Sequence, residues 1–135
     1  MMQACWSGLV MADSQDLVLV LTTERTMQQA ETLAAELLNR RLVACVSLSP
    51  VQSLYHWDGA LQRDTEVQLL LKTAASCLDA LQQAVFQLHS YDTPEWIIWS
   101  GQASPAYGRW LQAELRSDGS APAPSGRPDS GPPAG

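Results

Sequence analysis

The pair Asp58-Gly59, set between two long strand-like runs, is the feature that most constrains the fold of this chain. An Asp-Gly pair in this setting is typical of a two-residue β-hairpin turn. The run before it covers Val51–Trp57, and the run after it extends from about Gln62 to Thr73. Both runs are unusually long for so small a domain. Because a hairpin that extends past its own sheet leaves edges that need a partner, we expect oligomerisation through this hairpin.

Before the hairpin, the chain shows a strand, a helix and a second strand. The continuous apolar run Leu17–Thr22 is typical of a strand buried on both faces. Apolar residues then recur at spacings of three and four through 27–38, and Thr26 with Gln29 resembles a capping box at the start of this helix. Leu42–Leu48 follows as a strand, and we expect Pro50 to bend or interrupt it.

After the hairpin, the pattern repeats with a helix, a strand and a short last helix. Leu78, Leu81, Val85 and Leu88 form one apolar stripe, for which Ser76 and Asp79 are candidate caps. Trp96–Trp99 reads as a fourth strand, with the two tryptophans pointing to opposite faces, and Ser104-Pro105 opens the last helix. The order βαββαβ plus a C-terminal helix predicts an α+β, ferredoxin-like sandwich, with an antiparallel sheet and two helices on one face.

One folded domain is predicted, over residues 17–116. Residues 1–16 are expected to be a flexible N-terminal segment, and either Met1 or Met11 fits as the start. Residues 117–135 are rich in Gly, Pro, Ser and Ala without apolar periodicity, which predicts a disordered tail.

Charge and cysteine usage exclude several classes of protein. The net charge is −6 and Lys72 is the only lysine, which argues against nucleic-acid binding. No stretch approaches the roughly 20 apolar residues of a membrane helix. The three cysteines lack CxxC spacing and the N-terminus lacks a basic signal region, so we expect free thiols and a cytoplasmic protein.

The segment Leu88–Glu95 is the first candidate for a functional site. It places His89, Tyr91, Asp92 and Glu95 in one loop, where Pro94 disfavours helix. These groups include acids and a base. The sequence nevertheless has no nucleophile–base–orienter pattern and no phosphate-binding glycine loop, so we predict that the protein is not an enzyme and has no catalytic residues.

Four segments, in order, resemble the CutA family of divalent-cation-tolerance proteins. They are Arg41–Val46 (RLVACV), Leu54–Gly59 (LYHWDG), Glu66–Thr73 (EVQLLLKT) and the His89–Glu95 loop (HSYDTPE). The resemblance covers about Leu17 to Leu115.

The resemblance implies a homotrimer of ferredoxin-like subunits whose long hairpins pair across subunit boundaries. It also implies a non-enzymatic role in tolerance of copper and other divalent metal cations, with Cu²⁺ or another divalent cation as a possible ligand. Members resemble the PII signalling proteins in architecture. The alternative is therefore a PII-like sensor that binds a small anionic metabolite in clefts between subunits.

This chain departs from the metal-ligand pattern of some bacterial members. Leu21 stands where they have a cysteine, Leu88 replaces the first residue of a His-His pair, and Ser90 replaces a proline. Of that Cys/His/His set only His89 remains, so His89 is the one metal-ligand candidate. A Cu²⁺ or Zn²⁺ site needs several such ligands. One histidine per subunit therefore predicts weak metal binding, unless trimer symmetry brings further ligands near.

Five further residues match the family motifs and are candidates for an intersubunit cleft: Tyr55, Trp57, Lys72, Tyr91 and Glu95. In the functional interpretation, Lys72 offers its cation to an anionic ligand. In the structural one, the residues form a buried polar network that fixes the trimer, with Lys72 paired to Glu66 or Glu95. Both interpretations stay open at the level of sequence.

Overall fold

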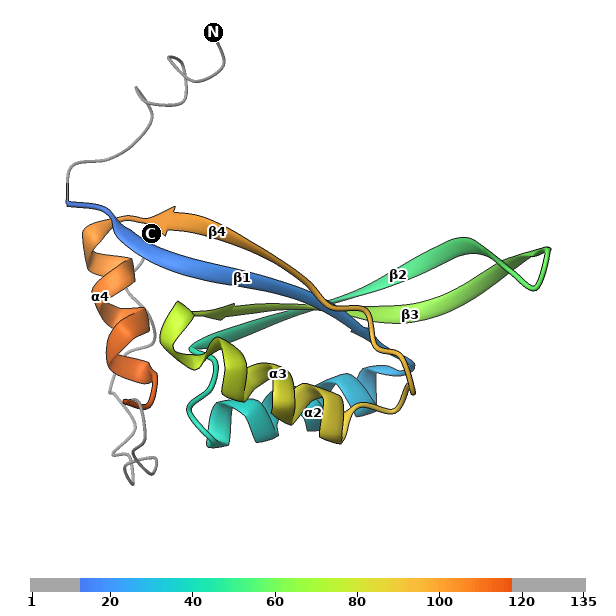
Figure 1. The fold of residues 1–135 in the computed structure, drawn as a ribbon, viewed down its shortest axis with the longest axis horizontal. Coiled ribbons are helices and arrows are strands. Elements are labelled where there is room, and N and C mark those ends of the chain that lie inside the picture. Colours follow the sequence, from blue (N-terminus) through green and yellow to red (C-terminus); the bar gives the residue numbers. More distant parts are fainter. Residues whose placement is uncertain (1–12, 118–135) are drawn as a thin grey trace, which may run out of the picture.

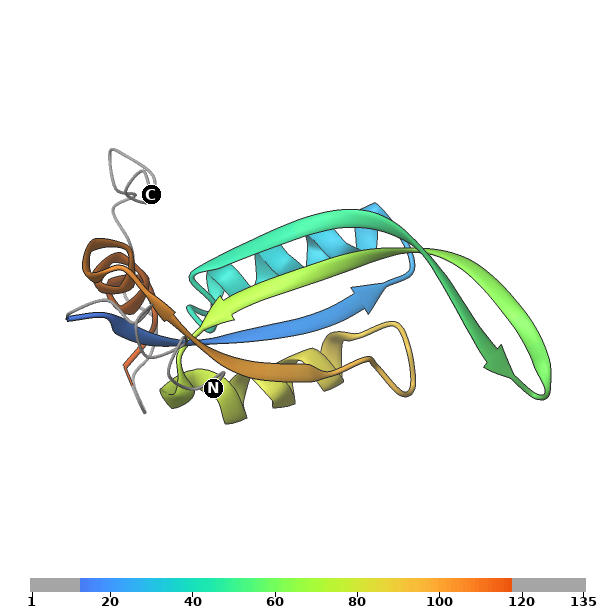
Figure 2. The same cartoon turned by 90° about the horizontal axis from the view of Figure 1, so that it is seen from above.

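A computed structural model describes residues 13–117, which form one antiparallel sheet with helices packed on it (Figures 1 and 2). The strands lie in the order β2-β3-β1-β4, and α2 and α3 cover one face. The predicted ferredoxin-like βαββαβ fold with a C-terminal helix is confirmed. The elements are β1 (Gln15–Glu24), α2 (Met27–Asn39), β2 (Cys45–Trp57), β3 (Ala60–Thr73), the 3₁₀ turn η1 (Ala75–Cys77), α3 (Leu78–Leu88), β4 (Ile97–Ala103) and α4 (Pro105–Glu114).

The helices and strands of the described residues run from Gln15 to Glu114. Strand β1 begins at Gln15, two residues before the expected start, because its pairing with β4 extends to Ala103. Residues 1–12 of the predicted flexible N-terminal segment and residues 118–135 of the predicted disordered tail lie outside the described residues.

The hydrophobic core lies between the sheet and the two helices. Alternate residues of each strand point toward the helices. Val20 of β1 and Leu69 and Leu71 of β3 are fully buried there against Leu37 of α2 and Leu81 of α3. Helix α2 begins as predicted, because the Thr26 hydroxyl accepts a hydrogen bond from the Gln29 backbone N–H at 3.1 Å.

The hairpin between β2 and β3 extends beyond the sheet. Pairing of β1 with β3 ends at Glu24 and Val67, whereas β2 and β3 stay paired out to Trp57 and Ala60. Residues 51–66 therefore form a two-stranded arm with no third strand beside it (Figure 1). At its tip Asp58 and Gly59 have φ of 53° and 73°, as a type I′ turn requires.

Two local predictions were wrong. Pro50 does not interrupt β2, which is continuous through its pairing with Val67. A proline is tolerated there because β2 is the edge strand of the sheet, where a missing backbone donor costs no ladder bond. Ser76 does not cap α3: it lies inside η1, and α3 begins after Cys77 without any side-chain cap hydrogen bond.

The face of the sheet opposite α2 and α3 is only partly covered. Helix α4 packs over one end of it, where Leu111 meets Leu17 and Ala103. Toward the arm, Ile97 and Trp99 of β4 stay 48% and 43% exposed. Trp96 points the other way, onto the core, so the predicted opposite orientation of the two tryptophans is confirmed. We call this uncovered surface around Ile97 and Trp99 the open face.

We predict that Gly108→Ala weakens the docking of α4. A Cβ at Gly108 would lie 2.1 Å from Cβ of Gln15, so the helix must move away from β1. Overpacking of this kind costs about 1–3 kcal/mol, against a gain of up to about 1 kcal/mol from helix propensity. The measurement is the free energy of unfolding in guanidinium chloride.

The matched control for this prediction is Gly101→Ala. Its added Cβ meets only ordinary contacts, 3.4 Å from Leu17 Cδ1 and 3.7 Å from Leu19 Cδ1. If Gly108→Ala is as stable as Gly101→Ala, the close approach of α4 to β1 does not constrain this position.

Candidate functional site

His89 is buried at the start of the loop that follows α3. The helix ends at Leu88, and the extended backbone of His89 turns its ring inward until the side chain has no exposed surface. Its Nδ1 accepts a hydrogen bond from the Tyr91 backbone N–H at 3.0 Å, and its Nε2 lies 2.5 Å from the Thr23 carbonyl oxygen. A backbone N–H can only donate and a carbonyl can only accept, so these two contacts place a ring proton on Nε2 and leave Nδ1 as the acceptor. Both nitrogens are therefore engaged within the subunit.

Glu24 is a buried carboxylate that holds the same loop. Its side chain is 2% exposed, and its two oxygens accept from the Ser90 backbone N–H at 3.1 Å and the Ser90 hydroxyl at 2.5 Å. The Arg25 backbone N–H adds a longer bond of 3.3 Å. A proline at position 90 would supply neither Ser90 donor. The serine that departs from the family pattern is thus the residue that joins the loop to the end of β1.

Sequence reasoning missed Glu24, although a signal was present. Glu24 continues the alternation of Val18, Val20 and Thr22, all of which face the helices. An acid in phase with buried residues is expected to point inward and to need donors.

Tyr91 and Glu95 lie around a third carboxylate, Glu66. The Tyr91 hydroxyl donates to Glu66 Oε1 at 2.9 Å, and the Arg25 guanidinium lies 5.0 Å from the centre of the Tyr91 ring. Burial, and then the bond to Glu66, raise the pKa of Tyr91 well above its usual range. Burial, and then the charge of Glu66, raise the pKa of Glu95. The loop thus places Tyr91 and Glu95 beside Glu66 of β3, and Arg25, which follows β1, lies over the Tyr91 ring.

The other three predicted cleft residues lie elsewhere in the subunit. Tyr55, on the arm, donates a hydrogen bond to Asp64, which is the main cause of its raised pKa. Trp57, near the tip, is 68% exposed. Lys72 lies near α4, with Nζ 5.9 Å from the centre of the Tyr107 ring. One subunit does not bring the five residues together, so the cleft between subunits stays a prediction.

The expected pairing of Lys72 with Glu66 does not form within the subunit. The two residues lie on one strand, six positions apart, which separates them by roughly 20 Å. Within residues 13–117 the ion pairs of lysine and arginine are Arg40–Glu36 and Arg41–Glu114, and neither involves Lys72.

The described residues contain no group of three or more His, Cys, Asp or Glu side chains that could hold a metal ion. His89 as a ligand stays a prediction, and ligation would require the loop to release one of its two ring hydrogen bonds. Among residues 13–117, Cys45 is partly exposed and Cys77 is buried, and both are free thiols. No helix in this range is long and apolar enough to span a membrane.

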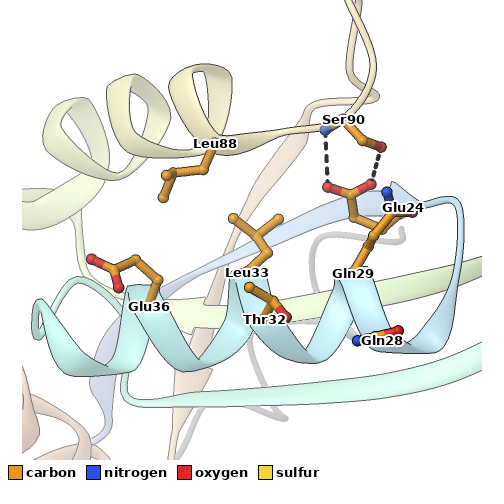
Figure 3. Close-up of a pocket in the computed structure, with 8 residues that line it drawn as sticks. All are labelled: Glu24, Gln28, Gln29, Thr32, Leu33, Glu36, Leu88 and Ser90. Carbon is orange, nitrogen blue, oxygen red and sulfur yellow. Dashed lines mark hydrogen bonds between the residues drawn. The ribbon is translucent and has the colours of Figure 1, made fainter.

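A pocket of about 350 Å³ lies on the helical side, between α2 and the start of the loop (Figure 3). Leu33 and Leu88 supply apolar surface, and Gln29 and Thr32 supply polar groups. The carboxylates of Glu24 and Glu36 also line it.

We predict that Glu24→Gln destabilises the protein by about 1–3 kcal/mol. The Ser90 hydroxyl can rotate to accept from the amide NH₂, but a backbone N–H cannot, so the N–H of either Ser90 or Arg25 loses its acceptor. The free energy of unfolding at neutral pH measures the loss. Glu31→Gln, an exposed acid of α2, is the control and is expected to change stability by no more than about 0.5 kcal/mol. Equal stability of the two variants would contradict this role for Glu24.

We predict that Glu95→Gln raises the melting temperature at pH 7. Because the pKa of Glu95 is raised in the folded state, the stability from its bound proton is present below the normal glutamate pKa of about 4.3 and is lost as pH rises. The neutral amide side chain in Glu95→Gln does not ionise, so the variant does not lose this stability as pH rises. Thermal unfolding from pH 3.5 to 8 measures the difference in melting temperature between Glu95→Gln and the wild type. This difference should vanish at the acid end of the range. Asp92→Asn, in the same loop, controls for the loss of one negative charge, and an equal rise there would contradict the prediction.

Comparison with known proteins places this chain in a family. Residues 18–114 match the family described as CutA1 divalent ion tolerance protein. The divalent-cation tolerance protein CutA of Pectobacterium atrosepticum is 44% identical, over 75% of this chain and 94% of the relative. The structure of CutA from Synechococcus elongatus superposes with a TM-score of 0.75 at 42% identity, covering 78% of this chain and 95% of that chain.

A plant structure extends the similarity. CutA1 from Oryza sativa gives a TM-score of 0.73 at 33% identity, covering 78% of this chain and 98% of that chain. The family match over residues 18–114 includes β1 from Val18 onward and every later helix and strand, with the arm and the His89–Glu95 loop. The chain belongs to the CutA1 divalent ion tolerance family.

Proposed function

We propose that this protein is a non-enzymatic cytoplasmic homotrimer that acts in the tolerance of divalent metal cations, copper among them. The observation that carries the assembly is the apolar surface that one subunit leaves uncovered on the open face and on the arm. The cation role is supported by the names of the relatives, which are divalent-cation tolerance proteins.

The arm has apolar residues on both of its sides. Leu54 and Leu61 lie on one side and are each 53% exposed, and Tyr55 and Trp57 lie on the other. None of the helices within residues 13–117 covers either side of the arm (Figure 2). Soluble proteins rarely leave extended apolar surface in water, so another copy of the chain is the natural cover.

The edges of the sheet support the same proposal. Strands β2 and β4 are the two outer strands and offer unpaired backbone groups along their lengths. An edge of one copy and an arm of the next complement each other in a closed ring. The number three comes from the resemblance to the family.

A cation role is compatible with the charge of the chain. The net charge of −6 favours the approach of cations. His89 is the ligand that we propose for copper, because it is the one member of the resembled ligand set that this chain keeps. A cytoplasmic location is supported by the free thiols Cys45 and Cys77. We infer no catalysis, because the sequence lacks a nucleophile–base–orienter pattern.

We predict a solution mass of three times the 14.7 kDa chain mass, and a loss of assembly in Trp99→Asp. A carboxylate on the open face would have to be desolvated at the interface, which is costly. Light scattering coupled to size-exclusion chromatography measures both masses. Leu38→Asp, on the exposed part of α2, is the control that should keep the native mass. A wild-type mass of one chain would overturn the trimer.

We predict that Cu²⁺ binding, measured by titration calorimetry, is lost in His89→Ala and kept in His56→Ala. His56 is the other histidine, and it is exposed on the arm. His89 must give up a hydrogen bond to bind metal, so its binding is expected to be weak. A heat of binding that is unchanged in His89→Ala would remove the direct metal role.

The PII-like alternative has one observation in its favour. Lys72 makes no ion pair within residues 13–117, so its cation is available to an anionic ligand or to a carboxylate of another copy. A thermal-shift measurement distinguishes these two roles. Small carboxylates or nucleotides should raise the melting temperature only if Lys72 binds an anionic ligand.

A further inference from the structure

We propose that Lys72 of each copy forms an ion pair with Asp64 on the arm of the next copy. This inference rests on the homotrimer proposed above, and it specifies which charged groups fix the position of one subunit on another. Both residues belong to β3, where they lie far apart within one chain.

Lys72 lies at the border between the open face and α4. Strand register places it directly opposite Leu19 of β1, which is in turn directly opposite Trp99 of β4. Residues directly opposite each other in an antiparallel sheet point to the same face. Trp99 and Lys72 therefore belong to one surface, and a partner that covers the exposed tryptophan also approaches the lysine.

The charge of Lys72 is not neutralised within the subunit. Lys72 is partly buried, and its Nζ lies 5.9 Å from the centre of the Tyr107 ring, near the outer limit of a cation–π contact. Neither of the ion pairs that lysine and arginine form within residues 13–117 includes it. Removal of the remaining water from an ammonium group without an anionic partner is costly. An interface that covers Lys72 therefore has to bring an anionic group to it.

The arm carries an anionic group on the side that continues the open face. Asp64 lies eight positions before Lys72 on β3, and an even separation places two side chains on the same face of a strand. Asp64 is exposed, and Tyr55 of β2 donates a hydrogen bond to its Oδ2. This bond orients the carboxylate, and none of the residues 13–117 forms an ion pair with it.

Asp64 and Lys72 cannot meet within one chain. Strand β3 is continuous from Ala60 to Thr73, and eight residues of extended strand span roughly 26 Å. Contact therefore needs a second copy. In a closed ring each copy offers one arm and one Lys72, so it gives a carboxylate to one neighbour and receives a carboxylate from the other.

The surroundings of the two charges are also complementary. On the arm, Tyr55 and Trp57 face the same side as Asp64 and are 40% and 68% exposed. On the sheet, Lys72 shares its row with Trp99, which is 43% exposed. Each surface thus combines exposed aromatic groups with an unneutralised charge, and the two charges have opposite signs. Such complementarity fixes the register of an interface.

Glu66 is the other acid on this side of β3 within the arm, and it is a poorer partner for Lys72. It is partly buried, and its Oε1 accepts a hydrogen bond from the Tyr91 hydroxyl at 2.9 Å. It also lies at the base of the arm, next to the last residue of β3 that pairs with β1. Asp64 is therefore the acid that the arm presents to a neighbouring copy.

The test follows assembly over a dilution series, by light scattering coupled to size-exclusion chromatography of the full-length chain. Asp64→Lys and Lys72→Glu each place like charges together at every contact of the ring. We expect each variant to need about tenfold more protein than the wild type for half-assembly. Asp64→Lys/Lys72→Glu restores opposite charges between copies and should return to within about threefold of the wild type. Because the two positions cannot meet in one chain, this rescue can arise only between copies.

Lys72→Glu/Glu31→Lys is the matched control. It has the same net charge as the double swap, but Glu31 is an exposed acid of α2, on the other side of the sheet. This control should assemble as poorly as Lys72→Glu alone. Circular dichroism checks that every variant is folded. If a charge reversal unfolds the chain, Asp64→Asn, Lys72→Gln and their double variant give the same cycle, and the double variant should then assemble no worse than the weaker single variant.

The outcomes separate this pair from the trimer on which it rests. A wild-type mass of one chain at every concentration overturns both. If the wild type is a trimer, assembly of the two single variants at wild-type concentrations overturns the pair alone. Two further results do the same: a double swap that assembles no better than Lys72→Glu, and an equal rescue by Lys72→Glu/Glu31→Lys, which indicates an effect of net charge.

Discussion

The structure depends on a sheet that α2 and α3 cover on one face, while α4 covers only one end of the other face. Strand β3 pairs with β1 on one side and β2 on the other, and its alternate residues meet α2 and α3. The remaining residues of β1 and β4 have only α4 to cover them at one end. This asymmetry gives the subunit a buried core on one face and leaves apolar surface exposed on the other. Proposals about assembly and clefts all follow from it.

The second organising feature is the polar contact between β1 and the loop after α3. Glu24 binds the backbone and hydroxyl of Ser90, and His89 bridges Thr23 and Tyr91. These bonds fix where the loop leaves α3, and the fixed loop in turn sets Tyr91 against Glu66. His89, the metal-ligand candidate from the sequence, therefore helps to fix the conformation of the loop within the subunit. The same contacts form one end of the pocket on the helical side.

Local signals predicted most of the fold. Thr26 and Asp58-Gly59 act on the nearby backbone, so their roles could be predicted from neighbouring residues. Helix α4 begins at Pro105 as predicted, although the Ser104 side chain makes no cap hydrogen bond. Pro50 was misread because its tolerance depends on β2 being an edge strand, which is a property of the whole sheet. The partners of Glu24 were also missed, since they lie 66 positions away in the sequence. Family motifs found the residues of the candidate cleft but not their separation within one subunit, because strand length rather than motif order sets that distance.

The arm has a consequence for how the protein folds and persists at low concentration. Its strands are joined by a two-residue turn, so its backbone bonds are local and can form early in folding. Its side chains, by contrast, are mostly exposed within the subunit. An isolated two-stranded ribbon is marginally stable in water, so the arm gains most of its stability from whatever docks on it. If the proposed assembly forms, dilution releases the arm from its partner before it affects the core, so the stability of the arm depends on protein concentration.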